Sequence, residues 1–107
     1  GLYNPDKNVL KNIREDICYD GAAFENAIKK AKNFTLDTSC SLSKPPKDFP
    51  KDSPYDYLLR LKQYNLIQAL PEGMLYSDKL IEWALEEFKT SLEFNQLLNR
   101  AVMFSEE

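Results

Sequence analysis

The sequence predicts an α+β fold that is predominantly helical: a helical hairpin and a C-terminal helix pair around a proline-rich arm, with one or two short strands. Apolar residues recur at helical spacing both before and after the middle of the chain. Between these stretches, residues 44–54 hold four of the six prolines. Because proline fixes φ and biases the preceding residue toward extended geometry, this arm is expected to be stiff and non-helical.

The N-terminal stretch predicts two helices joined by a tight turn. Asn4 and Pro5 have the character of a cap and a first-turn proline, so the first helix is expected over residues 5–19. Gly21 suits the left-handed conformation that often ends a helix, and the second helix is expected over residues 22–32. Together they predict an αα-hairpin that buries both apolar stripes against each other and a third element.

The proline arm leads into a short helix and then into an extended run. Ser53 can cap a helix that begins at Pro54 and runs to residue 62, and residues 64–70 read as a strand. Residues 35–43 alternate loosely between apolar and small polar side chains, which suits a weak strand and an irregular loop equally. The strand at 64–70 is expected to pair within a sheet that is completed outside this chain.

The C-terminal stretch predicts two helices or one bent helix. Ser77 opens the stretch, and a bend is expected between Thr90 and Glu93, where helix propensity weakens. The apolar residues of the first part keep the helical period. They are Leu80, Ile81, Ala84, Leu85, Phe88 and Leu92.

Composition limits the class of protein. The 107 residues are 43% hydrophobic and 29% charged, as in a single globular domain, residues 1–107, or a fragment of a larger one. No apolar run is long enough to span a membrane. The net charge of −3 argues against a dedicated nucleic-acid binder. Cys18 and Cys40 are expected to be free thiols in a reducing cytoplasm, and without histidine no metal site and no cofactor is assigned.

Basic residues gather around the arm. Residues 44–62 contain five basic and three acidic side chains, whereas residues 72–107 contain three basic and eight acidic ones. Basic side chains interleaved with tyrosines suit a small anionic ligand such as a phosphate or carboxylate. The alternative is that Arg60 and Lys62 form ion pairs with Asp52, Asp56 or the acidic C-terminal helix. The candidate anion-binding residues are Arg14, Lys47, Lys51, Asp52, Arg60 and Lys62.

Four motifs carry a family resemblance: GLYNP, LKNIREDI, KPPKDFPKDSPYDYLLRLKQY and FNQLLNRA. In this order they resemble the C-terminal half of the family called domain of unknown function 2461, conserved hypothetical proteins of roughly twice this length. The family commonly has glycine where this chain has Asp48, and histidine where it has Ser53. The first departure means that the loop does not need a conformation open only to glycine. The second removes a general base or metal ligand at that point.

The resemblance implies a partner, the N-terminal half of the same protein, and it implies no established activity. Three functions are therefore kept as alternatives. The first is a structural or binding half of a larger domain with a basic, anion-tolerant surface. The second is an enzyme whose active site is shared between the two halves. The third is a protein-interaction module, which predicts an exposed apolar strip along Leu66, Ile67 and Trp83.

Overall fold

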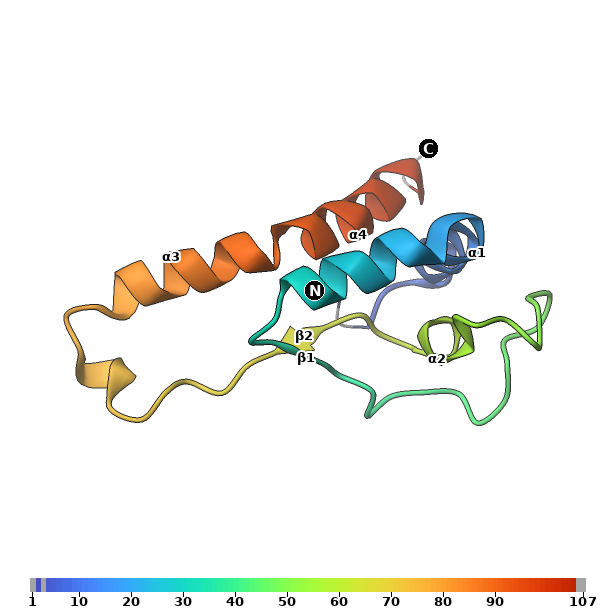
Figure 1. Cartoon of the computed structure of the whole chain (residues 1–107). Helices are drawn as coiled ribbons and strands as arrows, with labels where there is room; N and C mark the ends of the chain where they lie inside the picture. Colours follow the sequence, from blue (N-terminus) through green and yellow to red (C-terminus); the bar gives the residue numbers. More distant parts are fainter. Residues whose placement is uncertain (1, 3, 106–107) are drawn as a thin grey trace.

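The structure is a computed structural model that describes residues 2 and 4–105. It is an α+β fold, predominantly helical, as the sequence predicts. Four helices and one short 3₁₀ turn surround a two-stranded antiparallel sheet (Figure 1). The molecule is elongated, with extents of 49 × 30 × 23 Å.

Helix α1, Lys7–Lys30, replaces the predicted hairpin with one kinked helix. Its cap is Asp6, whose carboxylate accepts from the backbone N–H groups of Asn8 at 2.9 Å and Val9 at 3.0 Å. The predicted cap, Asn4, has a left-handed φ of 48°, which does not fit the extended backbone of a cap. The first helix therefore begins two residues later than expected.

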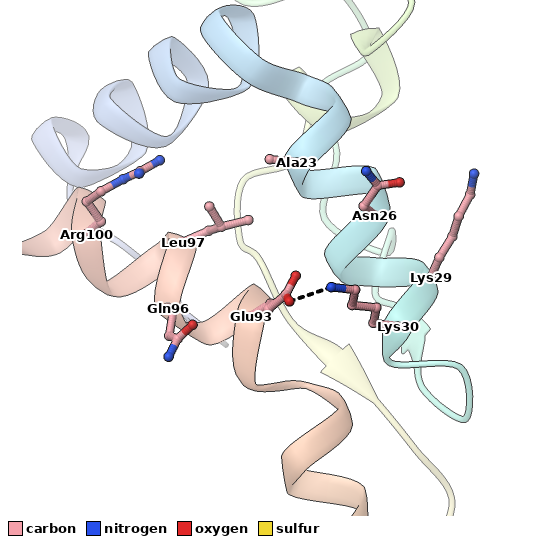
Figure 2. A pocket seen from close by; sticks show the side chains of 8 residues that line it. All are labelled: Ala23, Asn26, Lys29, Lys30, Glu93, Gln96, Leu97 and Arg100. Atoms are coloured by element: carbon pink, nitrogen blue, oxygen red, sulfur yellow. Dashed lines mark hydrogen bonds and ion pairs between the residues drawn. The ribbon is translucent and has the colours of Figure 1, made fainter.

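The change of direction in α1 comes at Asp20, within the predicted break. Asp20 has non-helical angles, φ −149° and ψ 70°, and its carboxylate accepts from the N–H of Ala23 at 3.2 Å. It therefore caps the second segment of α1 in the manner of a new helix start. The two segments diverge at this kink instead of folding back on each other (Figures 1 and 2).

Gly21 is needed at the kink for space. Its φ is not left-handed, so the predicted C-cap role is wrong. It is buried, and a Cβ added to it would overlap the side chain of Tyr55. The missing side chain lets the aromatic ring that precedes α2 lie directly against the α1 backbone.

Helix α2, Asp56–Leu59, is shorter than the predicted helix over residues 54–62. The predicted cap is wrong, because α2 begins at Asp56 and its N-cap residue is Tyr55, which makes no side-chain capping bond. The Ser53 hydroxyl accepts from the N–H of Tyr55 at 3.1 Å in the turn before the helix. The chain leaves the helix early because Leu61 pairs with Ser41 in an isolated antiparallel bridge. Residues 44–53 contain no helix, as the prolines predict.

The sheet pairs β1, Thr35–Leu36, with β2, Leu66–Ile67, in antiparallel register. Thr35 lies opposite Ile67, and Leu36 lies opposite Leu66. The strand expected at residues 64–70 therefore finds a partner within this chain, and completion of the sheet by a segment outside the chain stays a prediction. Residues 35–43, whose sequence suits a strand and a loop equally, supply that partner through their first two residues. The rest of this stretch is irregular, apart from the bridge at Ser41.

Helices α3, Leu80–Thr90, and α4, Leu92–Ser105, are separated at Ser91, within the predicted bend. The Ser91 hydroxyl donates to the carbonyl of Phe88 at 2.9 Å, a bond that competes with the helical ladder. A 3₁₀ turn, η1, Met74–Tyr76, precedes α3. Helix α4 packs along α1, whereas α3 and η1 extend away from this body (Figure 1).

The core lies where four parts of the chain meet: α1, α2, the segment between α2 and β2, and α4. Its residues are completely or almost completely buried, and they come from four different parts of the chain. They include Ile13, Ile17, Phe24, Ala27, Leu58, Leu59, Leu61, Tyr64, Phe94, Leu98 and Ala101. None comes from α3.

Candidate functional site

Arg14, one of the predicted anion-binding residues, binds backbone carbonyls. Its Nε donates to the carbonyl of Leu59 at 2.8 Å, and its Nη2 donates to that of Leu61 at 3.1 Å. These carbonyls lie at the C-terminal end of α2, where a helix leaves its last carbonyls without internal partners. The guanidinium therefore fastens α2 to α1.

Tyr64 also binds a backbone carbonyl of α2. Its ring is fully buried, and its hydroxyl donates to the carbonyl of Leu58 at 2.7 Å. Burial raises the pKa of the Tyr64 phenol, and the positive charge of Arg14 offsets part of that rise. The phenol therefore stays neutral and keeps its donor at physiological pH.

Arg60, a second predicted residue, is bound in two directions. Its Nε lies 2.7 Å from Oδ2 of Asp56, and its Nη1 donates to the carbonyl of Ser43 at 2.9 Å. The first contact is the ion pair that the sequence offered as the alternative to anion binding. The second ties the beginning of the arm to the end of α2, so Arg60 also holds the backbone in place.

The four remaining predicted residues are on the surface. Lys47, Lys51 and Asp52 lie on the arm, Lys62 follows α2, and all four side chains are exposed. Within residues 2 and 4–105, none of the four takes part in an ion pair. The structure thus places two of the predicted residues in backbone contacts and presents the others to solvent.

The largest hollow described on the surface is a groove between the second segment of α1 and α4 (Figure 2). It is open to solvent and has a volume of about 760 Å³. None of the six predicted residues lines it. Its lining residues are Ala23, Asn26, Lys29, Lys30, Glu93, Gln96, Leu97 and Arg100.

One of the three cations that line this groove is paired across it. Lys30 forms an ion pair with Glu93 at 2.6 Å, and the Lys29 side chain points away from α4 (Figure 2). Burial raises the pKa of the Asp16 carboxyl, and the positive charge of Arg100 counteracts this rise. The Lys30–Glu93 ion pair therefore joins α1 and α4 across the groove.

The outer face of α3 carries large apolar side chains that meet water. Leu92, the first residue of α4, is exposed to 42% next to this face. The three large apolar side chains of the face itself are exposed to 73% at Ile81, 57% at Leu85 and 56% at Phe88. At 100° per residue they lie within about 60° of one another around the helix axis. They form one stripe, called here the α3 apolar face.

The opposite side of α3 faces the body of the molecule, and its half-buried residues are Leu80, Trp83, Glu87 and Thr90. The Glu87 carboxylate accepts from the side-chain amide of Asn33 at 3.0 Å and 3.3 Å. Trp83 is half-buried near Leu66, as a residue at a seam between elements should be. The other charged residues of α3, Glu82, Glu86 and Lys89, are exposed like the apolar face.

A hollow of about 360 Å³ adjoins the α3 apolar face at the bend between α3 and α4. Phe88 belongs to both the face and the hollow, and Trp83, Phe34 and Leu66 supply further apolar walls. The expected exposed strip is thus only partly present at its predicted place, because Leu66 and Trp83 are half-buried while Ile67 is exposed. The larger exposed strip is the α3 apolar face, which lies on another side of α3 from Trp83.

The spacing of this face was visible in the sequence, but the surface that it meets was not. Ile81, Leu85, Phe88 and Leu92 follow one another at intervals of four, three and four residues. Such spacing marks an apolar helix face but not the surface that covers it. Only the contacts of Glu87 and Trp83 reveal which side of α3 meets the body.

Among residues 2 and 4–105, no three His, Cys, Asp or Glu side chains gather as a metal site would require, and no helix is long and apolar enough to cross a membrane. Cys18 and Cys40 are free and exposed, as predicted.

These observations define a small, predominantly helical α+β protein with one apolar helix face open to solvent. The chain belongs to the family described as conserved hypothetical protein (DUF2461), whose model matches residues 1–97. The resemblance found in the proline arm and its flanking motifs is thereby confirmed. Comparisons with curated proteins and with solved structures gave no match.

Proposed function

We propose that this chain is a structural and binding half of a larger domain, and that the N-terminal half of the same protein covers the α3 apolar face. The observation that carries the proposal is the exposure of Ile81, Leu85 and Phe88 on one face of α3. Exposed apolar patches of this kind mark interaction surfaces in soluble proteins. The family resemblance supplies the partner, because the relatives it implies are roughly twice as long.

The contacts of Arg14 and Arg60 support a structural role over an active site shared by both halves. Each guanidinium donates to backbone carbonyls of its own chain. A guanidinium held in this way stabilises the arm and has fewer donors left for a substrate. The enzyme alternative would have to depend on Lys47, Lys51, Asp52 and Lys62.

The test compares residues 1–107 with the product of the whole natural reading frame by hydrogen exchange. The α3 amides should exchange at least tenfold more slowly in the longer protein, because docking closes the helix. Leu85→Asp in the longer protein should restore fast exchange, since a carboxylate cannot be buried without a partner. Glu72→Asp, at an exposed loop position, serves as the matched control. Equal α3 exchange in both proteins would refute the proposal.

A second proposed property is the binding of a small anion by Lys47, Lys51 and Lys62. Its support is that all three are exposed and none is paired with a carboxylate in the described residues. Titration with inorganic phosphate, followed by NMR of the arm amides, should give saturable shifts that disappear when all three lysines are changed to alanine. Lys11→Ala, on an exposed face of α1, is the control. Shifts that never saturate, or that persist in the triple variant, would exclude a site here.

A further inference from the structure

The hollow of about 360 Å³ at the bend between α3 and α4 combines aromatic walls with a single charge. We infer that it binds a quaternary ammonium group, a cation whose nitrogen carries four carbon substituents. The inference goes beyond the proposed function and does not depend on it, because every residue that lines the hollow lies within residues 34–95. Three properties of the hollow support it: its aromatic side chains, its charge and its size.

The first property is the gathering of aromatic side chains. Phe34, Trp83 and Phe88 all line the hollow, although Phe34 lies far from the other two in the sequence. The faces of aromatic rings attract cations, and tryptophan does so best. Phe34 and Trp83 are half-buried, so water weakens this attraction less than it would at an exposed ring. Several aromatic side chains around one hollow are the arrangement by which proteins recognise quaternary ammonium groups.

The second property is charge. Glu87 is the one charged residue among the described residues that line the hollow. It is half-buried, and it forms no ion pair within the described part of the chain. Its carboxylate accepts from the side-chain amide of Asn33, and a carboxylate has about four acceptor sites, so capacity remains. The hollow therefore offers negative charge that no lining cation balances.

The groove between α1 and α4 has the opposite character. Three cations line it, Lys29, Lys30 and Arg100, against the single carboxylate of Glu93. A cationic ligand would meet net positive charge there and net negative charge in the hollow. Of the two, only the hollow suits a cation.

The third property is size, which together with polarity indicates the kind of cation. A volume of about 360 Å³ is near the lower end for small-molecule pockets, so the bound group is small. A primary ammonium has three N–H donors, and burying donors without acceptors costs free energy. Besides Glu87 and the apolar walls, the hollow has only uncharged polar residues, Gln68, Ser91 and Asn95. A quaternary ammonium fits this lining better, because it has no N–H donor and its alkyl groups gain by leaving water.

The experiment titrates residues 1–107 with choline and follows the fluorescence of Trp83, the single tryptophan of this chain. The emission should change saturably, because the cation would lie against the indole. The neutral alcohol in which carbon replaces the choline nitrogen has the same shape, and it should bind at least tenfold more weakly. Sodium chloride at the same concentrations should leave the emission unchanged. A choline response that does not saturate, or equal binding of the neutral alcohol, would overturn the inference.

Two substitutions locate the site, and circular dichroism checks that each variant is folded. Glu87→Gln keeps an acceptor for Asn33 and removes the charge, so it should weaken choline binding at least tenfold. Glu86→Gln, at the neighbouring exposed position outside the hollow, should leave the affinity unchanged. Phe88→Leu keeps an apolar side chain and removes the ring, so it should weaken binding of choline but not of the neutral alcohol. If Glu87→Gln and Glu86→Gln bind choline equally, the hollow is not the site.

Discussion

Helices α1 and α3 have the same kind of sequence and opposite surroundings. Both carry an apolar stripe at helical spacing, yet Ile13 and Ile17 of α1 are fully buried while Ile81 of α3 is 73% exposed. Helix α1 contacts both α2 and α4, whereas α3 touches mainly its neighbours in the chain, η1 and α4. An amphipathic pattern in the sequence therefore predicts a helix and its apolar face, but it does not identify the surface that packs against that face.

The polar contacts of the body and of α3 also differ in burial. In the body, Arg14 donates to the carbonyls of Leu59 and Leu61, which are far from it in the sequence. Tyr64 donates to the carbonyl of Leu58 in a buried hydrogen bond. In α3, the Glu86–Lys89 ion pair is local and exposed, so it contributes little to stability. The body is therefore expected to hold together alone, while α3 depends on packing that residues 1–107 do not give it.

The largest expected difference comes from removing apolar volume in each region of residues 1–107. Leu58→Ala should cost about 2–5 kcal/mol of unfolding free energy, because it leaves a cavity in a fully buried site. Leu85→Ala should change the free energy by less than about 0.5 kcal/mol, as at an ordinary surface position. Urea denaturation of both variants measures the two values. Equal costs would mean that α3 is packed as firmly as the body.

The next effect comes from adding volume. Gly21→Ala should destabilise the chain by about 1–3 kcal/mol, because the new methyl group meets the Tyr55 ring and the kink has no room to adjust. This loss would outweigh the helix propensity that alanine normally gains over glycine. The matched change in α3 is Ala84→Leu, at an exposed position, and it should be tolerated. A stabilised Gly21→Ala protein would show that the close approach of Tyr55 is not needed.

A smaller effect is expected from Arg14→Met, which keeps the length of the side chain and removes its donors. The carbonyls of Leu59 and Leu61 would lose charged hydrogen bonds, at a cost of about 2 kcal/mol. Thermal unfolding measures the change, and Lys47→Met, on the exposed arm, should leave the midpoint unchanged. If Lys47→Met proves the more damaging change, the assignment of Arg14 to structure is wrong.

The smallest effect is a gain. Asp48 has a left-handed φ of 70°, at the position where the family pattern has glycine. Asp48→Gly should therefore stabilise the body by about 0.5–1 kcal/mol, since glycine adopts this conformation without strain. Asp52→Gly, at a residue without a positive φ, should give no such gain. Chemical denaturation resolves this difference, and a loss at position 48 would point to a role for its carboxylate.

Much of the fold could be predicted because local rules decide it. The prolines of residues 44–54 prevent helix, and the weak propensity around Ser91 places the bend. The kink in α1 was located but misread as a turn between two helices. A single residue with non-helical angles, Asp20, was enough to redirect the helix without ending it.

The contacts between distant segments could not be predicted in the same way. Nothing local in the sequence indicates that Arg14 reaches the carbonyl of Leu59, 45 residues away, or that β1 pairs with β2. The predicted anion site was chosen by residue type and, apart from Arg14, by nearness in the sequence. Spatial placement then separated Arg14 and Arg60, which hold backbone, from the surface lysines of the arm.

The central claim is that the body of residues 1–107 is self-supporting and α3 is not. Native-state hydrogen exchange of this chain tests the claim most directly, because it gives an opening free energy for each helix separately. The account predicts that amides around Ile13 and Ile17 open only with global unfolding, while those of residues 80–90 exchange at least a hundredfold faster. Protection of α3 equal to that of α1 would contradict the account.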